Sequence, residues 1–190
     1  MDNLKFYANI ASELIAMAKQ DQEFRFGWFK HRNDPEWHKS EALMDKDYTA
    51  QLKKIVKKIG WPTINKVGVK ASHAAWLLVQ HASSDPIFQH KCLKLMERAK
   101  SGTIDQRQIA YLTDRLAIAE KRPQRFGTQY QTPSSNLLPP FPLKDPDKVD
   151  QLRAKYGLGP MKPYYDVVAM EKEEKKGVNF SSLDGYKKKE

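Results

Sequence analysis

Apolar side chains recur at every third or fourth position through much of the chain, which is the spacing of one face of an α-helix. Leu4, Tyr7, Ile10 and Leu14 show this spacing near the start. The pattern predicts helices over residues 4–24, 47–59, 65–82, 86–100, 103–120 and 145–157. Residues 25–45 and 121–145 lack it, and we expect both segments to be irregular.

Several helix ends carry residues that start or stop helices. Gly60-Trp61-Pro62 ends the second predicted helix, because Gly tolerates the left-handed C-terminal position and Pro cannot continue a helix. Asp85-Pro86 begins the fourth, with Asp as N-cap and Pro at the first helical position. Thr103 with Gln106 resembles a capping box, and Asp145-Pro146 opens the last helix.

These elements predict a mainly α protein, because no stretch alternates apolar and polar residues as a strand would. We expect an orthogonal bundle of about six helices in a single domain over residues 1–168, with a proline-rich loop wrapped over it. An aromatic insert at about 26–40 is either a lid or a packed loop. Residues 169–190 are charged and poor in apolar residues, so we expect a disordered tail.

Composition narrows the class of protein. With 190 residues and 40% hydrophobic content, the chain can bury a core of its own. Its apolar runs fall short of the ~20 residues that span a bilayer, and its start does not resemble a signal peptide, so we expect a cytoplasmic protein. The single cysteine, Cys92, excludes an intrachain disulfide and is interpreted as a core thiol.

The net charge of +10 permits an anionic partner without requiring one. Lys53, Lys54, Lys57 and Lys58 recur at helical spacing and are expected to form a solvated face. No zinc-finger spacing, aromatic ribonucleoprotein motif or GxxG clamp is present, so a nucleic-acid binder is not favoured.

Polar residues stand where core residues are expected. Gln80 and His81 end an apolar helical run, and Asp114 and Arg115 interrupt another. Buried polar groups must satisfy one another or meet a ligand, because an unpaired buried charge is expensive. A further polar cluster follows, with Gln124, Gly127, Thr128 and Gln129.

These residues suggest a site with divided roles. His81 is the candidate general acid or base, Asp114 its orienting partner, and Arg115 an anchor for a carboxylate or phosphate. The remaining candidate ligand-binding residues are Gln80, Gln124, Gly127, Thr128 and Gln129. No cofactor is indicated, and no metal is expected, because the histidines lack the i, i+4 spacing of a helical zinc site.

Each of these residues also has a purely structural interpretation. His81 could be a core histidine satisfied by a carbonyl, and Asp114 and Arg115 could tie the following loop to the bundle. Gly127-Thr128 could be a capped turn. Serine nucleophile elbows, P-loops and G-x-G-x-x-G are absent, so no standard reaction class is supported.

Several motifs together resemble a bacterial family of unknown function. They are Asp21-Gln22-x-x-Arg25, Gly60-Trp61-Pro62-Thr63, the run from Ala75 to His81, Asp114-Arg115 and the run from Pro123 to Gln129. The resemblance covers about residues 10–165 and implies no activity. The aromatic insert and the charged tail depart from it.

Two functions remain open. The first is an enzyme that uses acid–base chemistry on a small polar or anionic substrate, and it is weakly favoured because polar clusters in apolar settings often mark ligand sites. The second is a non-catalytic interaction module, in which a buried polar network fixes the packing and a basic face meets an acidic partner.

Overall fold

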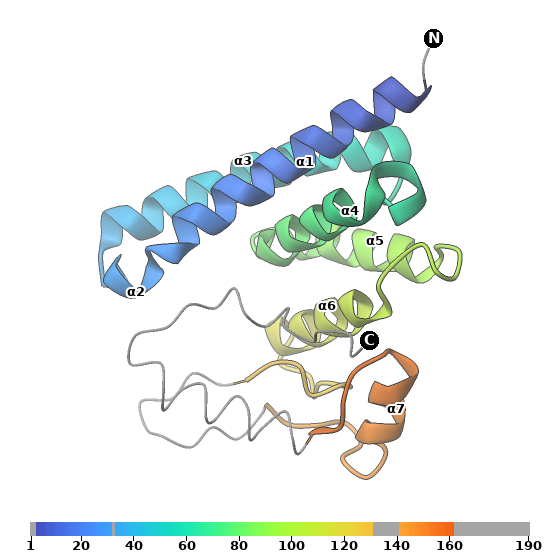
Figure 1. Ribbon diagram of the computed structural model, residues 1–190. Helices are drawn as coiled ribbons and strands as arrows, with labels where there is room; N and C mark the ends of the chain where they lie inside the picture. Colours follow the sequence, from blue (N-terminus) through green and yellow to red (C-terminus); the bar gives the residue numbers. More distant parts are fainter. Residues whose placement is uncertain (1–2, 32, 131–140, 162–190) are drawn as a thin grey trace, which may run out of the picture.

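The computed structural model describes residues 3–31, 33–130 and 141–161 of the protein (Figure 1). The helices are α1 (Asn3–Phe26), α2 (Trp28–His31), α3 (Pro35–Ile59), α4 (Ile64–His81), α5 (Pro86–Glu97), α6 (Gln106–Ala119) and α7 (Val149–Lys155). Across these described ranges, strand-like pairing is limited to one isolated parallel bridge between Gln124 and Leu143. The predicted mainly α helical bundle is confirmed.

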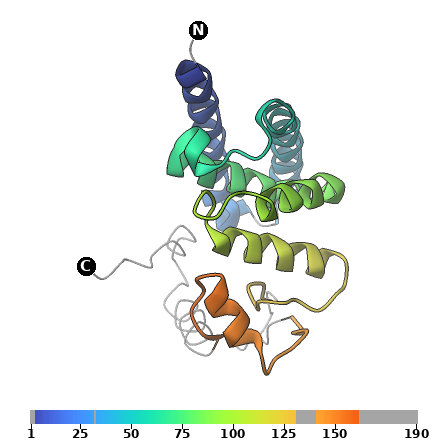
Figure 2. The same ribbon diagram turned by 90° about the vertical axis from the view of Figure 1, so that its right-hand side faces the viewer.

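The helices are stacked in layers. α1 and α3 run antiparallel, joined through α2, and both pack on α4; α5 and α6 follow, and α7 lies beyond α6 (Figures 1 and 2). Leu14, Leu52, Val79 and Leu112, from four of these helices, are fully buried in the shared core. Burying apolar area is the main favourable term in holding such layers together.

The expectation of an irregular segment over residues 25–45 is wrong. α1 continues to Phe26, and α3 begins at Pro35, well before the predicted start. Asp34 caps α3, its side chain accepting hydrogen bonds from the backbone N–H groups of Glu36 and Trp37. An Asp-Pro pair begins a turn or a helix equally well, because both use a capping oxygen and the fixed φ of proline.

Of the other predicted helix boundaries, some are confirmed and some are wrong. Gly60 ends α3 with a φ of 68°, and Asp85 caps α5 by accepting from the N–H of Phe88, both as predicted. The predicted capping box is wrong: Asp105 caps α6, whereas the Thr103 hydroxyl donates to the carbonyl of Lys100. α7 starts only at Val149 rather than at residue 145.

The predicted core thiol and the predicted solvated lysine face both lie in the described residues. Cys92 is buried, and burial raises its pKa to about 12, as befits a core thiol. Lys53, Lys54, Lys57 and Lys58 are all exposed. Among the described residues, none of the helices combines the length and the hydrophobicity that spanning a bilayer requires. The tail over 169–190 lies outside the described residues.

Candidate functional site

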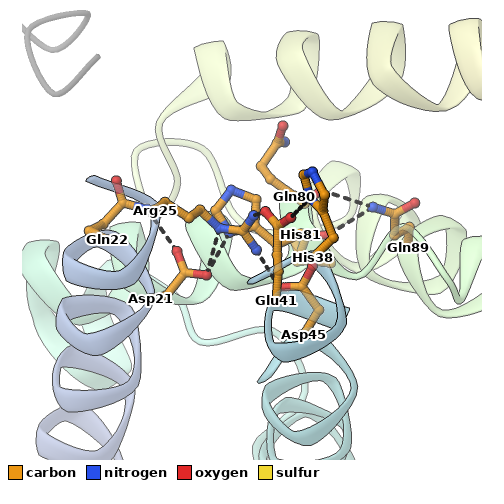
Figure 3. Close-up of polar contacts among 10 residues, drawn as sticks. Asp21, Gln22, Arg25, His38, Glu41, Asp45, Gln80, His81 and Gln89 are labelled. Carbon is orange, nitrogen blue, oxygen red and sulfur yellow. Dashed lines mark hydrogen bonds and ion pairs between the residues drawn. The ribbon is translucent and has the colours of Figure 1, made fainter. Parts of the chain in front are cut away.

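Five polar side chains converge where the end of α1, the first half of α3 and the end of α4 meet (Figure 3). α1 supplies Asp21 and Arg25, α3 supplies Glu41 and Asp45, and α4 supplies His81. Each pair is four positions apart and therefore shares one face of its helix. We call these five residues the α1–α3–α4 cluster.

Arg25 stands at the centre of this cluster and pairs with all three carboxylates. Its Nε donates to Oδ1 of Asp21 at 2.9 Å, Nη1 donates to Glu41, and Nη2 donates to Asp45. The guanidinium fork suits such contacts because its donors lie in one plane. Arg25 thereby joins α1 to α3 and offsets part of the negative charge.

His81 forms a second link, from α4 to α1. Its Nδ1 lies 3.0 Å from Oδ1 of Asp21, a side chain that is fully buried. A carboxylate at Nδ1 holds the proton on that nitrogen and leaves Nε2 with a free lone pair. The His81 side chain is 21% exposed, and within the described residues no hydrogen bond reaches its Nε2.

The surroundings shift the pKa values of the two aspartates in opposite directions. Burial alone would raise the pKa of Asp21, but the hydrogen bond and charge of His81, together with Arg25, outweigh it and lower that pKa. Burial raises the pKa of Asp45 above its usual value, although the charge of Arg25 opposes this. Of the two, Asp45 is therefore the more easily protonated.

Gln80 and Arg115 form a second polar pair, between α4 and α6. Nε of Arg115 donates to Oε1 of Gln80 at 2.6 Å. Gln80 is 4% exposed, and its Nε2 has no hydrogen-bond partner in the described ranges. Burial lowers the pKa of Arg115, and the positive charge of Arg25 lowers it further.

Asp114 has different partners from those predicted. Its carboxylate accepts from the backbone N–H groups of Arg125, Phe126 and Thr128 at 2.7–3.1 Å and from the hydroxyl of Thr128 at 2.9 Å. The predicted pairing with His81 is thus corrected, because Asp21 lies against that histidine. Adjacent helical residues point in different directions, so Arg115 reaches α4 while Asp114 holds the loop after α6.

The Gln124–Gln129 turn is held by its own contacts. Nε2 of Gln124 donates to the carbonyls of Gln129 and Phe141, and its Oε1 accepts from the Gln129 N–H. Gly127 has a φ of 66°, and a Cβ there would lie 2.5 Å from the Met161 side chain. Among the residues with described positions, none of the hydrogen bonds made by Gln124, Thr128 or Gln129 reaches the α1–α3–α4 cluster.

The α1–α3–α4 cluster also contains a set of groups that could hold a metal ion. One donor atom each from Asp21, Asp45 and His81 lie within 4.8 Å of one another. Carboxylate and imidazole groups together suit several divalent cations. Here the guanidinium of Arg25 pairs with both aspartates, so a bound metal ion would have to displace those ion pairs.

Sequence reasoning placed His81, Gln80 and Arg115 in the site but missed the acidic side chains around them. The Asp21-Gln22-x-x-Arg25 motif was itself a signal, because the Asp and Arg are one helical turn apart. Glu41 and Asp45 repeat that spacing, inside the segment expected to be irregular.

Comparison with known proteins adds a family and no activity. Residues 8–176 match the model of a family described as a family of unknown function, DUF6624. No curated protein and no solved structure is significantly similar to the chain.

Proposed function

Because the chain belongs to DUF6624, a family of unknown function, its site has to suggest its activity, and we propose an enzyme that uses acid–base chemistry on a small polar or anionic substrate. The observation that carries this proposal is the Asp21–His81 pair. A buried carboxylate orients the ring, while the opposite nitrogen has no hydrogen-bonding partner among the described residues.

In this proposal, Nε2 of His81 takes a proton from the substrate or from an attacking water and later returns it. Asp21 stabilises the imidazolium that forms in between, because its carboxylate is ionised and in contact with the ring. The lowered pKa of Asp21 keeps that carboxylate charged at neutral pH. Asp45, whose pKa is raised, offers a second carboxyl that gains a proton more easily.

The geometry supports a purely structural role for His81 less well. Buried polar atoms in folded proteins nearly always have partners, so the buried NH₂ group of Gln80, which has none among the described residues, is an exception. His81 has one partnered nitrogen, and the neighbouring Gln80 amide also has an unused donor. A part-exposed ring nitrogen together with an unused buried amide donor on the same helix end favours a ligand site.

The test is turnover against a substrate panel of phosphate monoesters, carboxylic esters, amides and lactones, with products detected by mass spectrometry. A positioned acid–base group contributes roughly 10²–10⁴ in rate, so His81→Asn should lose that factor for any substrate turned over. His90→Asn is the matched control, because His90 lies on α5 and pairs with Glu120, outside the cluster. Equal turnover by wild type and His81→Asn would show that the role assigned to His81 is wrong.

The exposed lysines of α3 favour a second candidate, a non-catalytic interaction module. Lys54, Lys57 and Lys58 are exposed along the C-terminal half of α3. An acidic partner held by this face should dissociate steeply as salt is raised, because exposed charges are screened. Binding that is lost on replacing these lysines but retained in Arg115→Ala would favour this candidate.

A further inference from the structure

We infer that Gln80 and Arg115 form the subsite that receives an anionic oxygen group, a carboxylate or a phosphate, of the ligand on which His81 acts. The inference rests on the proposed function for its link to His81. It is drawn from the buried NH₂ group of Gln80, which lacks an acceptor, and from the partly buried Arg115 guanidinium beside it, which has no carboxylate partner among the described residues.

Within the described ranges, the Gln80 amide uses only one of its two ends. Its Oε1 accepts from Nε of Arg115 at 2.6 Å, and this contact fixes which end of the amide faces the guanidinium. The NH₂ group is then left without an acceptor, on a side chain only 4% exposed. A buried donor without an acceptor is costly, so a ligand oxygen there would remove that cost.

The Arg115 guanidinium also has donors that are not used by the described residues. Its contact with Gln80 uses Nε alone, and no carboxylate among the described residues pairs with it. The two terminal nitrogens carry four further N–H donors in a planar fork. Such a fork matches the two oxygens of a carboxylate or of one edge of a phosphate.

Two other arginines of the described residues, Arg25 and Arg153, have more acceptors than Arg115. Arg25 pairs with three carboxylates. Arg153, 2% exposed, donates to the backbone carbonyls of Phe126, Gly127 and Gly159. Arg115 is less buried than Arg153, and its terminal donors have no such acceptors in the described part of the chain.

The Gln80–Arg115 pair lies near the α1–α3–α4 cluster. Arg115 lies within electrostatic range of Arg25, and Arg25 pairs with Asp21, the partner of His81, so an anion held at Arg115 lies next to the α1–α3–α4 cluster. The positive charges of Arg115 and Arg25 repel each other. A ligand anion would relieve that repulsion, whereas a cation would add to it.

The experiment uses the full chain and two probes, inorganic phosphate and malonate, titrated by calorimetry in a low-chloride buffer. Wild type should bind one of them at a single saturable site, and the preferred probe distinguishes a phosphate from a carboxylate ligand. Arg115→Gln should weaken that binding about tenfold or more, because hydrogen bonds to charged groups are lost. Arg98→Gln removes the same charge at an exposed position after α5 and should bind as wild type does.

A second variant separates binding from folding. Gln80→Glu places a carboxylate beside Arg115, so the free protein should melt at a higher temperature and no longer respond to the anion. Two results would overturn the inference: the absence of saturable binding of both probes to wild type, or equal binding by wild type and Arg115→Gln. A Gln80→Glu variant that melts lower and still binds would also count against it.

The outcome for His81 distinguishes this inference from the proposed function. His81→Asn should keep the anion affinity within a few-fold while losing turnover. If the protein binds an anion at Arg115 and His81→Asn turns over substrate as fast as wild type, only the proposed function is contradicted. Turnover that needs His81 in a protein that binds neither probe would contradict only the anion subsite.

Discussion

Among single residues of the site, Asp21 is a carboxylate that is fully removed from solvent. It satisfies both His81 and Arg25. Burying a carboxylate is costly unless such partners offset the lost hydration. Asp21 therefore contributes to stability only while it is charged.

We expect this contribution to appear as acid sensitivity. The pKa of Asp21 is lowered in the folded protein, so its stabilisation is complete above the unfolded value of about 4 and is lost as pH falls through the folded value. Asp21→Asn should lower the free energy of unfolding at pH 7 by about 1.5–3 kcal/mol and flatten its decline below pH 4. Urea unfolding at a series of pH values measures both effects; an unchanged acid limb would contradict the assignment.

Among the contacts between elements, those of Asp114 fix the turn that follows α6. One carboxylate holds three backbone N–H groups and a hydroxyl of the following turn. Arg153 of α7 then binds carbonyls of the same turn. The turn is thus clamped between α6 and α7, which explains why its polar residues are occupied with one another.

The prediction at this scale separates a structural from a catalytic Asp114. Asp114→Ala strands several buried N–H groups and should cost at least about 3 kcal/mol in urea unfolding. Thr128→Val is the milder comparison, because it removes only the hydroxyl contact and should cost about 1 kcal/mol. An Asp114→Ala protein of near wild-type stability that loses turnover would favour the catalytic role suggested by the sequence.

At the scale of the whole molecule, the α1–α3–α4 cluster ties together helices that begin and end far apart in the chain. Arg25 joins α1 to Glu41 and Asp45 of α3, and His81 joins α4 to α1. Removing one partner of an enclosed ion pair leaves charge without compensation, which typically costs more than the pair contributes.

Arg25→Gln should therefore destabilise the whole bundle by roughly 3–5 kcal/mol at pH 7. The three remaining carboxylates repel one another, and the pKa of Asp45 is already raised, so acidification toward pH 5 should recover part of the loss. Thermal unfolding at pH 5 and pH 7, with Arg98→Gln as the control for net charge, measures this. An Arg25→Gln protein whose stability deficit does not shrink toward pH 5 would argue against the network.

Local features of the sequence predicted most of the helices and many of their ends. Apolar spacing and residues such as Gly60 and Asp85 act through neighbours three or four positions away, so they can be interpreted without a fold. Asp34-Pro35 lies in the segment that we expected to be irregular, yet it begins α3, because turns and helix starts use the same residues. The sequence also drew attention to Gln80, His81 and Arg115, since polar groups within apolar runs need partners.

The partners of these polar groups follow from how the helices pack, which local spacing does not reveal. Asp21 and His81 are 60 positions apart, and Gln80 and Arg115 are 35 apart, so the packing of separate helices brings them together. Asp114 and Arg115 are adjacent in sequence yet serve different neighbours, because successive helical side chains point in different directions. Helical spacing shows which residues share a face, whereas the packing of the bundle determines what that face meets.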